Sequence, residues 1–182
     1  MLSIDLISAE KADNYYKHDN YYAAEKPGEW LETDLSRALG LSGKVEDRDW
    51  HRIIRGQDPR TSEELVQAGA NGKHRAGTDL TFSAPKSLSV LALIGGRLDL
   101  IEAQEKAVDS VLHYIGQHGV QIRKMINGKS EFIKTGNLLV AKFEHGLSRE
   151  KDCQLHTHAV VLNITRHGKA WKAVSNEQFF RK

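Results

Sequence analysis

The second half of this chain reads as one long helix followed by strands with no helix between them. Residues 98–118 carry apolar side chains at helical spacing, which is typical of an amphipathic helix. Consecutive strands without helical crossovers pair antiparallel. The pattern therefore predicts an α+β fold with a central, largely antiparallel sheet flanked by helices. The expected strands lie at 1–7, 79–83, 120–125, 138–145 and 155–166.

The first half of the chain gives weaker signals. Ser8 is placed to cap a helix that runs through Tyr16. Most of 26–60 is predicted to be irregular, because Gly, Asp and Pro interrupt it. Further helices are predicted at 34–39, at 62–70 and from residue 86 to the glycine pair at 95–96.

Composition limits the classes of protein to consider. The chain has 182 residues, 40% of them hydrophobic and 27% charged, which describes one ordinary globular domain. Its 26 Lys and Arg against 24 Asp and Glu give a net charge of only +2, so charge alone does not indicate a nucleic-acid-binding protein. The apolar run at 88–96 is too short to span a bilayer, and the N-terminus lacks the pattern of a signal peptide. We expect a cytoplasmic protein without membrane insertion.

Three histidines have the spacing of a metal site. Alternate side chains of a strand share a face, so His156 and His158 lie on the same side of theirs. The preceding strand ends at His145, and the loop between them returns the chain antiparallel, which brings the third imidazole opposite the other two. Three imidazoles with coordination positions left open are typical of a catalytic metal. The alternative is that these histidines only form hydrogen bonds on a sheet face.

Four of the five tyrosines lie within eight residues, in the segment NYYKHDNYY. Paired tyrosines often serve as packing at the edge of a core. A tyrosine that acts as a nucleophile needs a nearby cation or base, and an open metal site could polarise the phosphate that it attacks. Such an attack leaves a covalent phosphotyrosine ester and a free sugar hydroxyl.

Three motifs together resemble a known family. They are YYKHDNYY, the stretch GTDLTFSAPKSLS at 77–89, and FEHGLSREKDCQLHTHAVVLN at 143–163. In order and spacing they resemble the MobF family of conjugative relaxases (TrwC/TraI type), within the histidine-hydrophobe-histidine endonucleases. The resemblance implies a palm-like antiparallel sheet. It also implies site- and strand-specific nicking and strand transfer of single-stranded DNA at the origin of transfer in plasmid conjugation.

The resemblance also assigns roles to residues. Tyr15 corresponds to the nicking nucleophile and Tyr21 to the tyrosine of a later strand transfer, with Tyr16 and Tyr22 as substitutes. Asp79 corresponds to an aspartate beside the metal, which orients a ligand imidazole or accepts the phenol proton. The residues expected to contact phosphate are Arg75 and Lys86, which flank the Asp79 strand.

Cofactor and partners are implied by the same resemblance. The family uses Mg or Mn, whereas three imidazoles suit Zn, Ni, Cu or Co better by ligand softness. The expected partners are single-stranded DNA and a DNA hairpin at the plasmid transfer origin, together with accessory relaxosome and coupling proteins. We expect a monomer in the bacterial cytoplasm, with 1–182 as a relaxase domain that is cut short before its C-terminal DNA-clamping segment. In complete proteins of the family, a helicase comes after this domain.

Two other functions fit parts of the sequence. A zinc-dependent hydrolase or hydratase would use the three-histidine site and leave the tyrosines idle. A DNA-hairpin binding module would use histidines and tyrosines for contacts without cutting. Changing Tyr15 to Phe separates the three functions, because only the relaxase would lose a covalent product.

Overall fold

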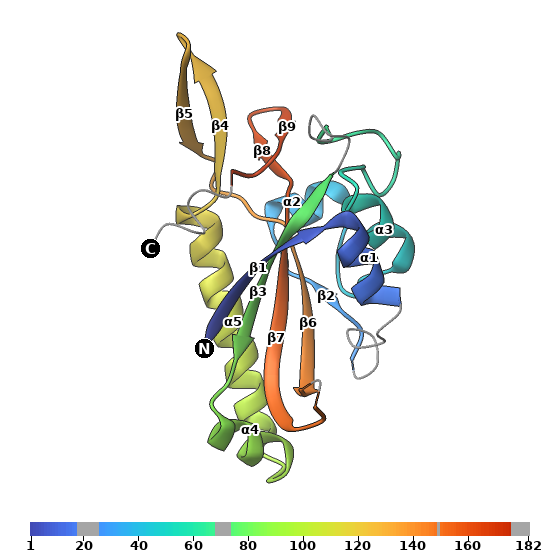
Figure 1. Ribbon diagram of the computed structural model, residues 1–182, viewed down its shortest axis with the longest axis vertical. Coiled ribbons are helices and arrows are strands. Elements are labelled where there is room, and N and C mark those ends of the chain that lie inside the picture. Colours follow the sequence, from blue (N-terminus) through green and yellow to red (C-terminus); the bar gives the residue numbers. More distant parts are fainter. Residues whose placement is uncertain (18–25, 68–73, 149, 176–182) are drawn as a thin grey trace.

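The computed structural model describes residues 1–17, 26–67, 74–148 and 150–175, with only the backbone of 14–17. Helices cover both faces of a five-stranded sheet (Figure 1). None of the helices in these ranges is long and apolar enough to cross a membrane. In chain order the elements are β1 (Leu2–Ser8), α1 (Ala9–Lys17), β2 (Glu29–Trp30), α2 (Asp34–Leu39), α3 (Asp47–Ile53), β3 (Arg75–Ser83), α4 (Lys86–Leu93), α5 (Leu98–His118), β4 (Gln121–Ile126), β5 (Lys129–Lys134), β6 (Val140–Leu147), β7 (Cys153–Leu162), β8 (Thr165–His167) and β9 (Ala170–Lys172).

The sheet has the strand order β1-β3-β7-β6-β2, and every neighbouring pair is antiparallel. This confirms the predicted α+β class with a largely antiparallel sheet. Strand β3 lies between β1 and β7, so residues near 79 reach the centre of the sheet beside residues near 160. The β4–β5 ribbon forms a separate pair that extends away from the sheet (Figure 1).

The two faces of the sheet pack against different helices. Ala141, Phe143 and Val160 lie on one face and share a core cluster with buried residues of α1, α2 and α3. We call this side the α1–α3 face. Val140 and Val161 lie on the other side and pack against α5. The period-two alternation along β6 and β7 places these residues on opposite sides.

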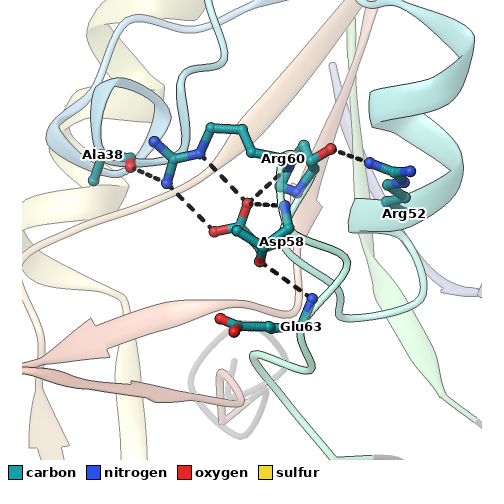
Figure 2. A network of polar contacts seen from close by, with 7 residues as sticks. Ala38, Arg52, Asp58, Arg60 and Glu63 are labelled. Atoms are coloured by element: carbon teal, nitrogen blue, oxygen red, sulfur yellow. Dashed lines mark hydrogen bonds and ion pairs between the residues drawn. The ribbon is translucent and has the colours of Figure 1, made fainter.

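The helix predicted at 62–70 is wrong over 62–67, which form an irregular loop; 68–70 lie outside the described residues. Local hydrogen bonds compete with the helix. The Asp58 carboxylate accepts the backbone amides of Arg60 and Thr61 (Figure 2). The Asp58 amide donates to the Glu63 carbonyl. Arg60 also donates to the Ala38 carbonyl, which ties the loop to α2.

Several elements differ from the prediction in extent. Helix α3 forms inside the stretch predicted to be irregular, and Trp50 and Ile53 on one side of it are buried. The strand predicted at 155–166 is two strands, because the Asn163 side chain between them accepts from the Val174 amide and from Arg75. The helices at 34–39 and 98–118 are confirmed with the predicted bounds.

Candidate active site

Three histidine rings gather on the α1–α3 face near the hairpin that joins β6 to β7. His145 pairs directly with His156 in the ladder, and His158 comes two residues later on the same face. The ring centres are 5.3 Å apart for His145 and His156, 5.7 Å for His145 and His158, and 5.2 Å for His156 and His158. His145 and His156 are buried, and His158 is nearly so. The expected convergence of the three rings on one face is therefore present.

The spacing of the rings fits one ion between them. With metal–nitrogen bonds of about 2.0–2.1 Å, two imidazoles on one tetrahedral ion have ring centres about 5 Å apart. As the side chains stand, however, no group of three or more His, Cys, Asp or Glu in the described ranges has the arrangement of a formed metal site.

His145 is held in the form that ligates metals. Burial, and then the neighbouring charges of His158 and His156, lower the pKa of His145 to about 3. The imidazole is neutral at neutral pH, and a neutral imidazole is the form that donates a nitrogen lone pair to a metal.

His158 is oriented from the neighbouring strand β3. Asp79 lies opposite Val160 and Thr81 lies opposite His158. The His158 Nδ1 is 2.7 Å from the Asp79 carboxylate and 3.1 Å from the Thr81 hydroxyl. A carboxylate on Nδ1 fixes the ring and leaves Nε2 for a ligand. Thr81 is absent from the sequence-based predictions, although its position two residues after Asp79 already places both on one face.

Helix α1 brings Tyr15 and Tyr16 to the same face of the sheet as the histidines. The helix begins directly after β1 and turns back beside the sheet (Figure 1). Its residue Ala12 is buried in the core cluster that contains Phe143, and Phe143 pairs with His158. Tyr15 and Tyr16 lie in the last turn of α1 by their backbone. Tyr21 and Tyr22 lie outside the described residues.

The two residues predicted to contact phosphate have different surroundings. The half-buried Arg75 guanidinium donates to the Asn163 side chain and to the Val174 carbonyl. Burial lowers the pKa of Arg75. Lys86 begins α4, is exposed, and its Nζ lies 3.9 Å from an Asp152 carboxylate oxygen. Lys86 is therefore placed to meet a ligand from solvent, whereas Arg75 is engaged within the protein.

The aromatic rings of Trp50 and Phe143 pack on the same face of the sheet as the histidines. The Trp50 ring meets the Phe143 ring edge to face, with centres 5.4 Å apart and planes at 78°. Gly28 lies against the same ring, and a Cβ at this position would come within 2.3 Å of Phe143. A side chain at this position would therefore force the Phe143 ring to move.

Comparison with known protein families gives one match over most of the chain. The model of the TrwC relaxase family matches residues 9–182. The multifunctional conjugation protein TraI of Escherichia coli is 42% identical over 181 residues, which are 98% of this chain. The chain spans 10% of the length of that relative.

Solved structures agree with this match. A conjugative relaxase TrwC in complex with oriT DNA, in a metal-bound structure, superimposes with a TM-score of 0.83 and 35% identity over 98% of this chain and 63% of the other. TrwC complexed with a 27-mer DNA comprising the recognition hairpin and the cleavage site gives a TM-score of 0.82 and 36% identity, over 97% of this chain and 61% of that one.

Proposed function

Since the chain belongs to the TrwC relaxase family, we propose that it nicks one strand of DNA at a plasmid origin of transfer through a covalent tyrosyl-phosphodiester intermediate. One observation carries the proposal: the three histidines, one of them oriented by Asp79, share a sheet face with the helix that contains Tyr15. A three-histidine hydrolase would not require this helix beside its metal.

Each residue has a distinct part in this reaction. His145, His156 and His158 would hold a divalent ion, and Asp79 fixes the His158 ring. The ion, when bound, withdraws electron density from the scissile phosphate. Tyr15 attacks the phosphorus with its phenol oxygen; the new oxygen–phosphorus bond forms as the bond to the leaving sugar oxygen breaks. The phenol proton is lost to solvent and a proton from solvent completes the sugar hydroxyl.

The proposal also covers the second strand transfer, the metal ion, the DNA substrate and the partner proteins. Tyr21 would carry out the second transfer, which rejoins the strand. Mg or Mn would be the working ion, with Zn, Ni, Cu or Co accepted by the same nitrogens. The substrate would present a hairpin next to the single strand, as in the relative solved with its recognition hairpin and cleavage site. Lys86 is our candidate for a phosphate contact. The partner proteins would be accessory relaxosome and coupling proteins. The relaxase itself would be a monomer in the cytoplasm.

Tyr15→Phe tests the proposal directly. The protein is mixed with a labelled single-stranded oligonucleotide carrying the transfer origin of its plasmid and with Mg or Mn, and adducts that survive denaturation are counted. We expect an adduct with the unchanged protein and a loss of about a hundredfold or more with Tyr15→Phe, because the substitution removes the oxygen that attacks the phosphorus.

Tyr114→Phe is the matched control, since Tyr114 is an exposed tyrosine on α5. It should form adduct at the normal rate. Hydrolysis without adduct would favour the three-histidine hydrolase, and tight binding of the oligonucleotide without cleavage would favour the binding module. Either outcome would contradict a relaxase.

A further inference from the structure

We propose that helix α3 sets the distance between the nucleophile and the metal ligands, and that Asp13 is the positioning residue through which it holds the nucleophile. The inference rests on the proposed function, because it takes α1 as the carrier of Tyr15. Its basis is that α3 is attached to both halves of the site, at consecutive residues.

The first attachment joins α1 to α3 and to Arg55, which follows α3, through polar contacts. One Asp13 carboxylate oxygen lies 2.9 Å from the His51 Nδ1, and the other lies 3.0 Å from a guanidinium nitrogen of Arg55. Arg55 also donates to the His51 carbonyl, at 2.8 Å, so its side chain is fixed on the α3 side. Asp13 stands two residues before Tyr15 in the same short helix. Its carboxylate therefore fixes the rotation and the height of the turn that carries the tyrosine.

The second attachment joins α3 to the metal strand through packing. Trp50 is buried and contacts Phe143 edge to face. Phe143 lies opposite His158 and two residues before His145 on the same face. Trp50 and His51 are neighbours in α3, so one rigid turn touches the strand with its indole and α1 with its imidazole. A shift of this turn would move the phenol and the metal ligands relative to each other.

The Asp13 contact is better suited to positioning than an ordinary surface ion pair. The Asp13 and His51 side chains are only 17% and 25% exposed, so solvent screens their interaction less than that of exposed pairs. The hydrogen bond from Arg55 to one carboxylate oxygen and the His51 ring beside the other oxygen also limit its direction, whereas a single contact would leave the carboxylate free to rotate. Transfer to a phosphorus atom requires the attacking oxygen in line, and an error of about 1 Å can cost about 10²-fold in rate.

Asp13→Asn keeps the shape of the side chain and removes its charge. We expect the rate of adduct formation on the transfer-origin oligonucleotide to fall by about tenfold or more. The dissociation constant for the oligonucleotide, measured by fluorescence anisotropy with Tyr15→Phe in the background, should change by less than about twofold, because the Asp13 side chain is largely covered and engaged by His51 and Arg55. Amide hydrogen exchange should become faster in α1 and stay unchanged in β6.

Arg48→Gln is the matched control on the same helix. Arg48 is exposed and pairs with Asp49, a residue of α3 itself, so its loss leaves the α1 contact intact. It should leave rate, affinity and exchange unchanged. Arg55→Gln should repeat the effect of Asp13→Asn, and Arg55→Lys, which keeps the positive charge, should restore part of the rate.

The outcomes separate the inference from the proposed function. A normal cleavage rate in Asp13→Asn would overturn the inference and leave the relaxase proposal standing. An equal loss of rate, DNA affinity and exchange protection throughout the sheet would also overturn it, since Asp13 would then serve only folding. If the unchanged protein forms no adduct, the proposed function fails. Hydrogen exchange in α1 still tests the role of Asp13 in that case, because unchanged exchange in Asp13→Asn would refute that role.

Discussion

Asp79 contacts His158 through one carboxylate oxygen, at 2.7 Å from Nδ1. Asp79→Asn keeps the size of the side chain but replaces a charged acceptor by a neutral amide, which orients an imidazole less strongly. We expect the affinity for Mn or Zn to fall about 10–100-fold, as is usual when such a supporting group is removed. Isothermal titration calorimetry measures the change.

Asp99→Asn is the control for this prediction, because Asp99 is an exposed carboxylate paired with Arg97. Its metal affinity should equal that of the unchanged protein. Equal affinities for Asp79→Asn and the unchanged protein would show that the Asp79 contact does not support the ligand.

At single residues, the predictable features were those that alternation along one strand imposes. His156 and His158 share a face because of the two-residue period, and His145 joins them because the hairpin is short. Thr81 was missed because its contact with His158 depends on the register between β3 and β7, which come from distant parts of the chain. The positions of the Tyr15 and Tyr21 phenols remain predictions.

Among the elements, the loop after α3 depends on one buried carboxylate (Figure 2). Burial alone would raise the pKa of Asp58, but hydrogen bonds from the amide and guanidinium of Arg60 and the amide of Thr61 outweigh it, so the pKa lies below its ordinary value of 3.8. A lowered pKa stabilises the fold above pH 3.8, and this stabilisation is lost as pH falls through the folded-state value.

Asp58→Asn should therefore lower the free energy of unfolding by about 1–3 kcal/mol at pH 7, the usual cost of weakening hydrogen bonds to a buried charge. The difference from the unchanged protein should shrink as pH falls below 3.8. Urea denaturation at pH 7 and below pH 3.8 measures this difference in the free energy of unfolding. Asp152→Asn, at an exposed carboxylate, should change stability by less than about 0.5 kcal/mol; a difference in Asp58→Asn that persists unchanged in acid would contradict the assigned role.

Elements with a long apolar repeat could be predicted from the sequence. Short elements that depend on tertiary burial or on local hydrogen bonds could not. Helix α5 shows its spacing over 21 residues and has the predicted bounds. Helix α3 has only 7 residues, and burial of Trp50 and Ile53 rather than its own pattern decides that it forms. The stretch at 62–67 contains residues that favour a helix, but the amides of Leu65 and Val66 donate to the Gly56 carbonyl instead of to carbonyls within the stretch.

In the molecule as a whole, the histidines lie on β7, the middle strand of the sheet, and on its neighbour β6, so an ion there binds only the folded chain. At a hundredfold excess over its dissociation constant, a ligand adds about 2.7 kcal/mol to stability. For a chain of this size, this is a rise of about 5–10 °C in melting temperature. Thermal melting with and without Mn or Zn measures the shift.

His156→Ala should abolish the shift, whereas His113→Ala, at an exposed histidine of α5, should keep it. An equal shift in all three proteins would show that the ion binds elsewhere.

The class of fold could be predicted because hairpin-connected strands leave few arrangements, but the strand order could not. Nothing in the sequence indicates that β3 inserts between β1 and β7, since this depends on packing of both faces at once. Gly77 lies so close to the β7 backbone that a Cβ would come within 2.1 Å of the Val161 carbonyl oxygen. This need for glycine, too, can be recognised only once the sheet is assembled.

The insertion of β3 also determines when the site can exist. Asp79 leaves the ribosome long before His158, and the two cannot meet until β7 has been synthesised and has docked beside β3. A nascent chain that ends before residue 158 carries tyrosines but lacks the completed ligand set. The proposed nicking would therefore begin only once β7 has joined the sheet.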